Sequence, residues 1–91
     1  MALRTVRRHI VFSGYVQGVG FRYHAKYKAE ALGLTGYVRN CSDGSVEMEA
    51  EGDEQSVYAL IAAMREHVWG SVDNVEIENV PVQDDRYFDI R

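Results

Sequence analysis

The spacing of apolar residues along this chain changes twice from every second residue to every third or fourth. Residues 7–13 alternate as a strand does, whereas helical spacing starts at Phe21 and ends before Gly33, a residue type favoured just after a helix. The members of this first helical stripe are Phe21, Ala25, Ala29 and Leu32. Strand character returns over residues 34–52, and Asp53 is a good N-cap for a second helix. The second stripe consists of Val57, Leu60, Ile61, Met64 and Val68.

Residues 45–52 show the clearest alternation and predict how the sheet is covered. Their apolar side chains face one way and their carboxylates the other, in the order Val46, Glu47, Met48, Glu49, Ala50 and Glu51. We expect the carboxylates to lie on a solvated face, across from Arg7 and His9 of the first strand. The preceding Ser42-Asp43-Gly44 predicts a hairpin turn with Asp-Gly at its centre.

The complete order is strand, helix, two strands, helix and strand, followed by a short last strand. The final two segments with strand character are residues 72–80 and 87–90. Two helices are too few to cover both faces of a sheet, so both should pack on the apolar face. We therefore predict an α+β fold, a ferredoxin-like βαββαβ sandwich in which an antiparallel sheet carries both helices on one face.

Length and composition set limits on the function. Ninety-one residues predict one domain, 1–91, because a second core would leave too few residues for either. Ten Lys and Arg against fourteen Asp and Glu argue against a nucleic-acid or anionic-membrane surface, which needs a basic footprint. Cys41 is the single cysteine, and the early apolar run 10–12 is too short for a signal peptide or a membrane span. We expect a cytoplasmic monomer.

The turn between the first strand and the first helix carries the strongest indication of chemistry. Residues 15–20, Tyr-Val-Gln-Gly-Val-Gly, follow Gly14, and the glycines allow backbone conformations in which N–H groups converge on one point. The helix that follows adds its own free N–H groups and the positive end of its dipole. Arg22 lies in its first turn, where a cation is unfavourable for the helix but can hold two phosphate oxygens at once. This spacing predicts an oxyanion site for a phosphoryl group, and it equally fits a tight structural turn with Arg22 paired to a glutamate.

Asn40 is a second candidate, at the end of the second predicted strand. A lone asparagine beside a turn usually caps its own hairpin. The order of the elements does not by itself bring this strand end close to the Gly-rich turn. The residues alone therefore leave both interpretations of Asn40 open.

Two motifs in this sequence resemble those of the acylphosphatase family. Residues 14–22, GYVQGVGFR, match the family's loop G-x-V-Q-G-V-x-F-R at every defined position. Residues 36–40, GYVRN, are followed after three residues by GSV at 44–46 and after five more by Gly52, which resembles the second motif at full length. The order of elements extends the resemblance over essentially the whole chain, as for a small stand-alone acylphosphatase.

The resemblance implies an enzyme that hydrolyses carboxyl-phosphate anhydrides to a carboxylate and inorganic phosphate. It implies no cofactor, no metal and no covalent intermediate. The phosphoryl group would be held by Arg22 and by the backbone of Val16, Gln17, Gly18, Val19, Gly20 and Phe21. Asn40 would hold the attacking water, and the substrate's own phosphate would take the proton from that water. The partner is then a small-molecule acyl phosphate, with phosphate or sulfate as a competing ligand. The connection 68–71 is shorter than the Gly/Pro-rich one of many relatives.

Other functions are less well supported by the sequence. A carbamoyl-phosphate-binding module, as in the large hydrogenase-maturation carbamoyltransferases, often has proline after the loop arginine, where this chain has Tyr23 and then ends at Arg91. An RNA-binding sheet is disfavoured by the row of glutamates. The three histidines lack the spacing of metal ligands, and Cys41 has no neighbouring histidine to activate it as a nucleophile.

Overall fold

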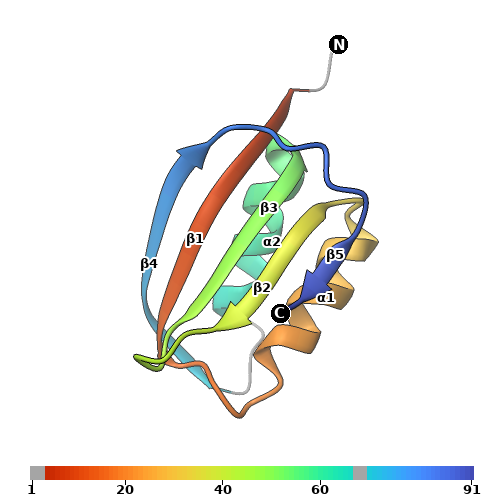
Figure 1. Cartoon of the computed structure of the whole chain (residues 1–91). Coiled ribbons are helices and arrows are strands. Elements are labelled where there is room, and N and C mark those ends of the chain that lie inside the picture. Colours follow the sequence, from red (N-terminus) through yellow and green to blue (C-terminus); the bar gives the residue numbers. More distant parts are fainter. Residues whose placement is uncertain (1–3, 67–69) are drawn as a thin grey trace.

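The computed structural model describes residues 4–66 and 70–91 and contains, in that part of the chain, two helices and one sheet (Figure 1). The elements are β1 (Thr5–Tyr15), α1 (Phe21–Ala31), β2 (Thr35–Asn40), β3 (Val46–Asp53), α2 (Glu54–Glu66), β4 (Ser71–Val80) and β5 (Phe88–Ile90). The strand order is β4-β1-β3-β2-β5, with antiparallel pairs except for the parallel pair β2–β5. Both helices cover the same face, so the predicted ferredoxin-like α+β sandwich is confirmed. The short last strand makes the sheet mixed.

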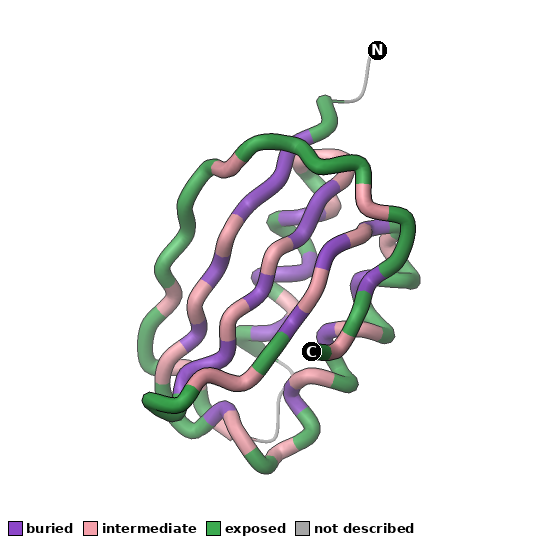
Figure 2. Tube along the Cα trace, in the orientation of Figure 1, coloured by how far each residue is buried: buried purple, intermediate pink, exposed green. Residues whose placement is uncertain are grey.

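The core lies between the helices and the apolar face of the sheet, where Figure 2 shows buried positions alternating along the central strands. The predicted stripes supply it, with Phe21, Ala25 and Ala29 from α1 and Val57, Leu60, Ile61 and Met64 from α2. Leu32 packs against this core while remaining partly exposed, and Val68 lies outside the described residues. The sheet contributes Ile10, Phe12, Val38, Met48 and Ala50, all fully buried. Helical and strand periodicity therefore identified the two surfaces that meet.

Both predicted helix ends have the expected local chemistry. Gly33 adopts the left-handed conformation, with φ of 72°, and donates its N–H to the Glu30 carbonyl, while the Leu34 N–H reaches the Ala29 carbonyl at 2.9 Å. This is the double hydrogen bond that ends a helix at glycine. At the start of α2, the Asp53 carboxylate accepts the N–H of Ser56 at 3.3 Å, as an N-cap does.

The face of the sheet away from the helices differs from the expectation of a solvated surface. Arg7 is 1% exposed and Glu51 is 5% exposed, although both were expected to face water. The Arg7 guanidinium binds three carboxylates, those of Glu49 at 2.6 Å, Asp85 at 3.0 Å and Glu51 at 3.1 Å. Burial lowers the pKa of Arg7, but the hydrogen bonds from Glu49, Asp85 and Glu51 outweigh it, so its pKa is raised.

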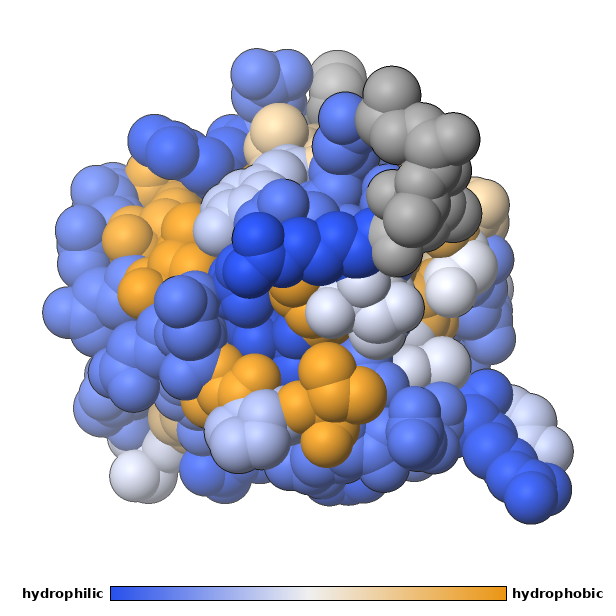
Figure 3. Space-filling model, turned by 90° about the horizontal axis from the view of Figure 1, so that it is seen from above, coloured by the Kyte–Doolittle hydropathy of each residue, from blue (hydrophilic) through white to orange (hydrophobic). Residues whose placement is uncertain are grey.

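The segment between β4 and β5 causes this burial. The N–H groups of Gln83 and Asp84 donate to the two Glu51 oxygens at 2.7 and 2.9 Å. Asp84 has a positive φ of 57°, which places successive N–H groups over the carboxylate. The segment crosses the end of the molecule at which β1 begins, and in Figure 3 that end is mainly hydrophilic with small separate apolar groups.

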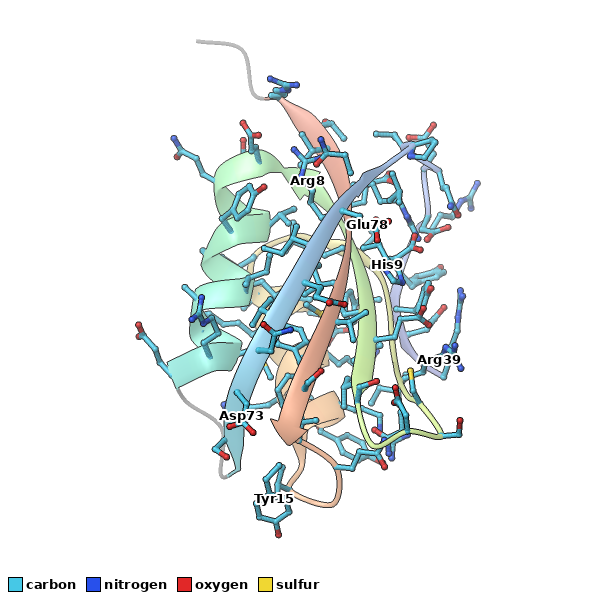
Figure 4. The ribbon with its side chains drawn as sticks, turned by 90° about the vertical axis from the view of Figure 1, so that its left-hand side faces the viewer. Arg8, His9, Tyr15, Arg39, Asp73 and Glu78 are labelled. Atoms are coloured by element: carbon cyan, nitrogen blue, oxygen red, sulfur yellow. The ribbon has the colours of Figure 1, made fainter. Side chains whose placement is uncertain are left out.

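Lower on the same face, His9 and Glu47 form a second polar group. His9 Nε2 lies 2.7 Å from Glu47 Oε2, and Arg39 binds the other oxygen of Glu47. Figure 4 shows His9 and Arg39 on the side away from the helices and Arg8 toward α2. The carboxylates of β3 thus form a network of ion pairs with Arg7, His9 and Arg39.

Neither of the two described helices is long and apolar enough to span a bilayer.

Candidate active site

The Gly-rich loop between β1 and α1 is held at both ends by buried side chains. Val16 is 1% exposed, and Phe21 packs edge-on against Phe12 with ring centroids 5.0 Å apart. Between these anchors, Gly18 and Gly20 have φ values of 74° and 79°, a left-handed conformation that disfavours other residues. The loop is therefore a fixed turn whose shape depends on its glycines.

The start of α1 presents backbone N–H groups that have no partner among the described residues. Gly20 is the N-cap and has no side chain to bond them, and the first turn contains no acidic residue. The first helical hydrogen bond runs from the His24 N–H to the Gly20 carbonyl at 3.1 Å. Within the described part of the chain, no amide of residues 16–21 donates a hydrogen bond. Such a helix start is suited to an anion, which both the free N–H groups and the helix dipole favour.

A small pocket of about 90 Å³ opens at this helix start. The residues that line it are Val16, Gly18, Gly20, Phe21, Arg22, Tyr23 and Asn40. Five of these were predicted to surround a phosphoryl group, and Asn40 was the candidate that the sequence could not place. Gln17 and Val19, also predicted for the site through their backbone, are not among the lining residues.

Asn40 reaches the loop because of the strand order. It is paired with Val46 of β3, and Val46 is in turn paired with Phe12 of β1, so the three residues form one row across the sheet. β1 and β2 end on the same side of this row. A strand order with β3 between them therefore brings the end of β2 to the loop that follows β1.

The side chain of Gln17 ties this loop to the β2–β3 hairpin. Its Nε2 donates to the Cys41 carbonyl at 2.7 Å and to the Ser45 carbonyl at 2.9 Å. Cys41 directly follows Asn40, so the two hydrogen bonds fix the distance between the loop and the pocket residue on β2. The sequence motif singled out Gln17 for its backbone only, and the positioning role of its side chain was missed because its acceptors are carbonyls far along the chain.

The hairpin itself does not depend on Asn40. Asp43 Oδ1 accepts the Ser45 N–H at 3.0 Å and the Ser45 hydroxyl at 2.6 Å, and these bonds lower the pKa of Asp43. The Gly44 N–H reaches the Cys41 carbonyl, which centres the turn on residues 42–43 and not on Asp43-Gly44 as expected. No described residue bonds the side chain of Asn40. The interpretation of Asn40 as the cap of its own hairpin is therefore wrong.

Among the described residues that line the pocket, Arg22 alone is charged. It is half-buried, and within the described ranges its guanidinium has no ion pair, so the alternative of a pairing with glutamate is not observed. Arg39, one residue before Asn40, is instead bound to Glu47 on the other face. Although the chain has a net charge of −4, the pocket is locally positive through Arg22 and the helix start.

Two larger surface hollows lie along the helices, away from this constellation. One, of about 320 Å³, lies between α1 and α2, and the other, of about 540 Å³, lies between α2 and β4. Neither contains a predicted site residue. Among residues 4–66 and 70–91, no cluster of His, Cys, Asp and Glu has the arrangement to hold a metal ion.

Comparison with known proteins agrees with the motifs. The sequence model of the Acylphosphatase family matches residues 8–90. The chain belongs to the acylphosphatase family. An acylphosphatase of Bifidobacterium longum is 46% identical over 89 residues, which cover 94% of this chain and 92% of that protein.

Solved structures of acylphosphatases share the fold as well. An acylphosphatase from Coxiella burnetii superposes with a TM-score of 0.90 at 40% identity, over 96% of this chain and 93% of the other. Full-length HypF in its phosphate- and nucleotide-bound form superposes with a TM-score of 0.89 at 27% identity, and the match covers all of this chain but only 12% of HypF. The same fold thus occurs both as most of a chain and as a small part of one.

Proposed function

We propose that this chain hydrolyses acyl phosphates in the pocket at the start of α1. One observation supports this above all: the Gly-rich loop, the start of α1, Arg22 and Asn40 line one pocket of about 90 Å³, and the side chains of Arg22 and Asn40 have no partner among the described residues. An anion there would satisfy the N–H groups and the guanidinium together. The acylphosphatases from Bifidobacterium longum and Coxiella burnetii, similar over almost their full length, support the same substrate class.

In the proposed mechanism, the two ends of the site have different tasks. The Arg22 fork binds two phosphoryl oxygens, and the loop amides bind the third. The Asn40 side chain holds a water in line with the bond to the acyl oxygen. The water oxygen attacks phosphorus, the bond between phosphorus and the acyl oxygen breaks, and its electron pair leaves on the carboxylate.

The proton of the attacking water goes to a phosphoryl oxygen of the substrate. None of the seven described lining residues is a carboxylate or a histidine that could act as a general base. An acyl phosphate does not require one, because its carboxylate is a good leaving group and positioning with charge stabilisation can lower most of the barrier. Nor does the mechanism call for a metal ion, because Arg22 and the helix start neutralise the phosphoryl charge.

The test is release of phosphate from benzoyl phosphate by the purified protein, with and without EDTA. We expect hydrolysis that EDTA does not reduce. Arg22→Ala removes a contact of two charged hydrogen bonds, each contributing about 1.5–3 kcal/mol, and should lower kcat/KM at least ~100-fold. Arg86→Ala, an exposed arginine outside the pocket, is the matched control. Full activity of a folded Arg22→Ala protein, or loss in EDTA that magnesium restores, would show the proposal to be wrong.

A further inference from the structure

The pocket that would hold the phosphoryl group is small, about 90 Å³, against about 320 and 540 Å³ for the two hollows along the helices. In the proposed mechanism it holds the phosphoryl group and the attacking water. The acyl group is attached to the phosphoryl group, and an exposed side chain at the mouth of the pocket can border it.

Among the described residues that line the pocket, Tyr23 has the side chain best placed to border the acyl group. Val16 and Phe21 are buried, Gly18 and Gly20 have no side chains, and the two remaining neighbours of Tyr23 in the pocket lining are polar. Tyr23 is 59% exposed, which leaves much of its ring open to a ligand. In the described part of the chain, neither its ring nor its hydroxyl has a partner. An exposed aromatic ring without a structural task at the mouth of a phosphoryl pocket is suited to stack on a planar ligand.

We propose that Tyr23 binds the acyl group and makes the enzyme prefer planar aromatic acyl phosphates over acetyl phosphate. The inference rests on the proposed hydrolysis of acyl phosphates. Arg22 and Tyr23 are successive residues of α1, so their side chains diverge by about 100° around the helix axis. Arg22 can thus hold the phosphoryl group while Tyr23 receives the group attached to it.

The geometry of the reaction agrees with this placement. The attacking and leaving oxygens of a phosphoryl transfer lie roughly in line on opposite sides of phosphorus. Asn40, which would hold the water, comes from β2, whereas Tyr23 comes from the first turn of α1. The two side chains therefore approach the pocket from different elements, so one can be assigned to the nucleophile and the other to the leaving group.

The effect should be on binding more than on the chemical step. A ring that stacks on the acyl group touches substrate and transition state alike, so its removal raises KM and changes kcat little. The typical strength of an aromatic pair corresponds to roughly a three- to tenfold change in affinity. Acetyl phosphate has no ring to stack on Tyr23, so its KM should not change when the Tyr23 ring is removed. The preference for benzoyl phosphate should therefore fall by the factor by which its KM rises.

The experiment compares kcat and KM for benzoyl and acetyl phosphate in four proteins: the wild type, Tyr23→Ala, Tyr23→Phe and Tyr27→Ala. Tyr27 is the control, because it lies one turn further along α1, is 67% exposed and lines only the hollow between the helices. We expect Tyr23→Ala to lower the benzoyl-to-acetyl ratio of kcat/KM roughly three- to tenfold through the benzoyl KM. Tyr23→Phe should keep the wild-type ratio, because it keeps the ring.

Three results would overturn the inference. An unchanged ratio in Tyr23→Ala would show that the ring does not contact the acyl group. An equal loss in Tyr27→Ala would assign the effect to the helix surface in general. A fall in kcat for both substrates would make Tyr23 part of the phosphoryl site. A wild-type protein that hydrolyses neither compound would instead refute the proposed function, which keeps the two failures distinct.

Discussion

Gln17→Ala is the substitution that tests how the pocket is assembled. The Gln17 amide spans from the loop to the Cys41 and Ser45 carbonyls, at 2.7 and 2.9 Å. Both carbonyls keep a backbone partner when the amide is removed, from the Gly44 and Cys41 N–H groups. The substitution should therefore lower the free energy of unfolding by the net contribution of two hydrogen bonds, about 1–3 kcal/mol in total. The larger penalty for a buried carbonyl without any partner does not apply. For a domain of this size we expect Tm to fall by about 5–20 °C.

The same substitution should reduce activity in a folded protein. Without the amide, the loop and the strand end that carries Asn40 are no longer held at a fixed separation, and a shift of about 1 Å can cost ~100-fold in rate. Gln17→Ala should thus lower kcat for benzoyl phosphate by about 10- to 100-fold. The affinity for inorganic phosphate should change only a few-fold, because Arg22 and the loop amides that bind it remain.

The assay combines thermal unfolding, steady-state kinetics below Tm and phosphate binding by titration calorimetry. Gln55→Ala, which removes an exposed amide from α2, is the matched control and should leave both Tm and kcat near their wild-type values. Gln17→Glu keeps the length of the side chain but offers the carbonyls an acceptor, so it should be at least as damaging as alanine. A folded Gln17→Ala protein with wild-type kcat would refute the positioning role and leave Gln17 a residue of stability alone.

Three further outcomes follow from the contacts described. Arg22→Lys should recover little of the kcat/KM lost in Arg22→Ala, because a point charge lacks the two-pronged geometry; recovery to within threefold in a kinetic assay would contradict this. Gly36→Ala should destabilise the fold by about 3 kcal/mol or more in urea unfolding, since φ is 134° and an added Cβ would lie 1.9 Å from the Glu49 carbonyl oxygen; a change below ~1 kcal/mol would refute it. The hydrogen bond from His9 lowers the pKa of Glu47, so this carboxylate stabilises the fold above its ordinary pKa of 4.5, and the contribution disappears as pH falls through its lower folded pKa. His9→Gln should flatten the loss of stability between about pH 5 and 3, measured by urea unfolding, and an unchanged pH slope would contradict the assignment.

The fold could be predicted in most of its elements because its apolar spacing is regular and local. The glycine and aspartate that end α1 and begin α2 act on residues within one turn, so their roles are visible in the sequence. The burial of Arg7 and Glu51 was not predictable in this way. It depends on residues 83–85, which lie more than thirty positions from Glu51 and carry no periodic signal of their own.

The candidate site was predictable in its chemistry but not in its assembly. The glycines, the helix start and Arg22 are adjacent in sequence, and their combination indicates an anion without any tertiary information. Asn40 joins them only through the strand order, in which β3 lies between β1 and β2. The Gln17 side chain bonds carbonyls that are far from it in the sequence, and Tyr23 borders a pocket that forms only when the chain folds. The resemblance to the family implied that Asn40 belongs to the site, and the strand order explains why it lies beside the loop.

The most direct test of the mechanism is hydrolysis of benzoyl phosphate in ¹⁸O-labelled water, with mass spectrometry of both products after subtraction of the uncatalysed reaction. Attack of water on phosphorus, with cleavage of the bond between phosphorus and the acyl oxygen, predicts one labelled oxygen in the inorganic phosphate and none in the benzoate. Label in the benzoate would show attack on the acyl carbon, and would contradict a pocket in which Arg22 holds the phosphoryl group while Asn40 directs water to it.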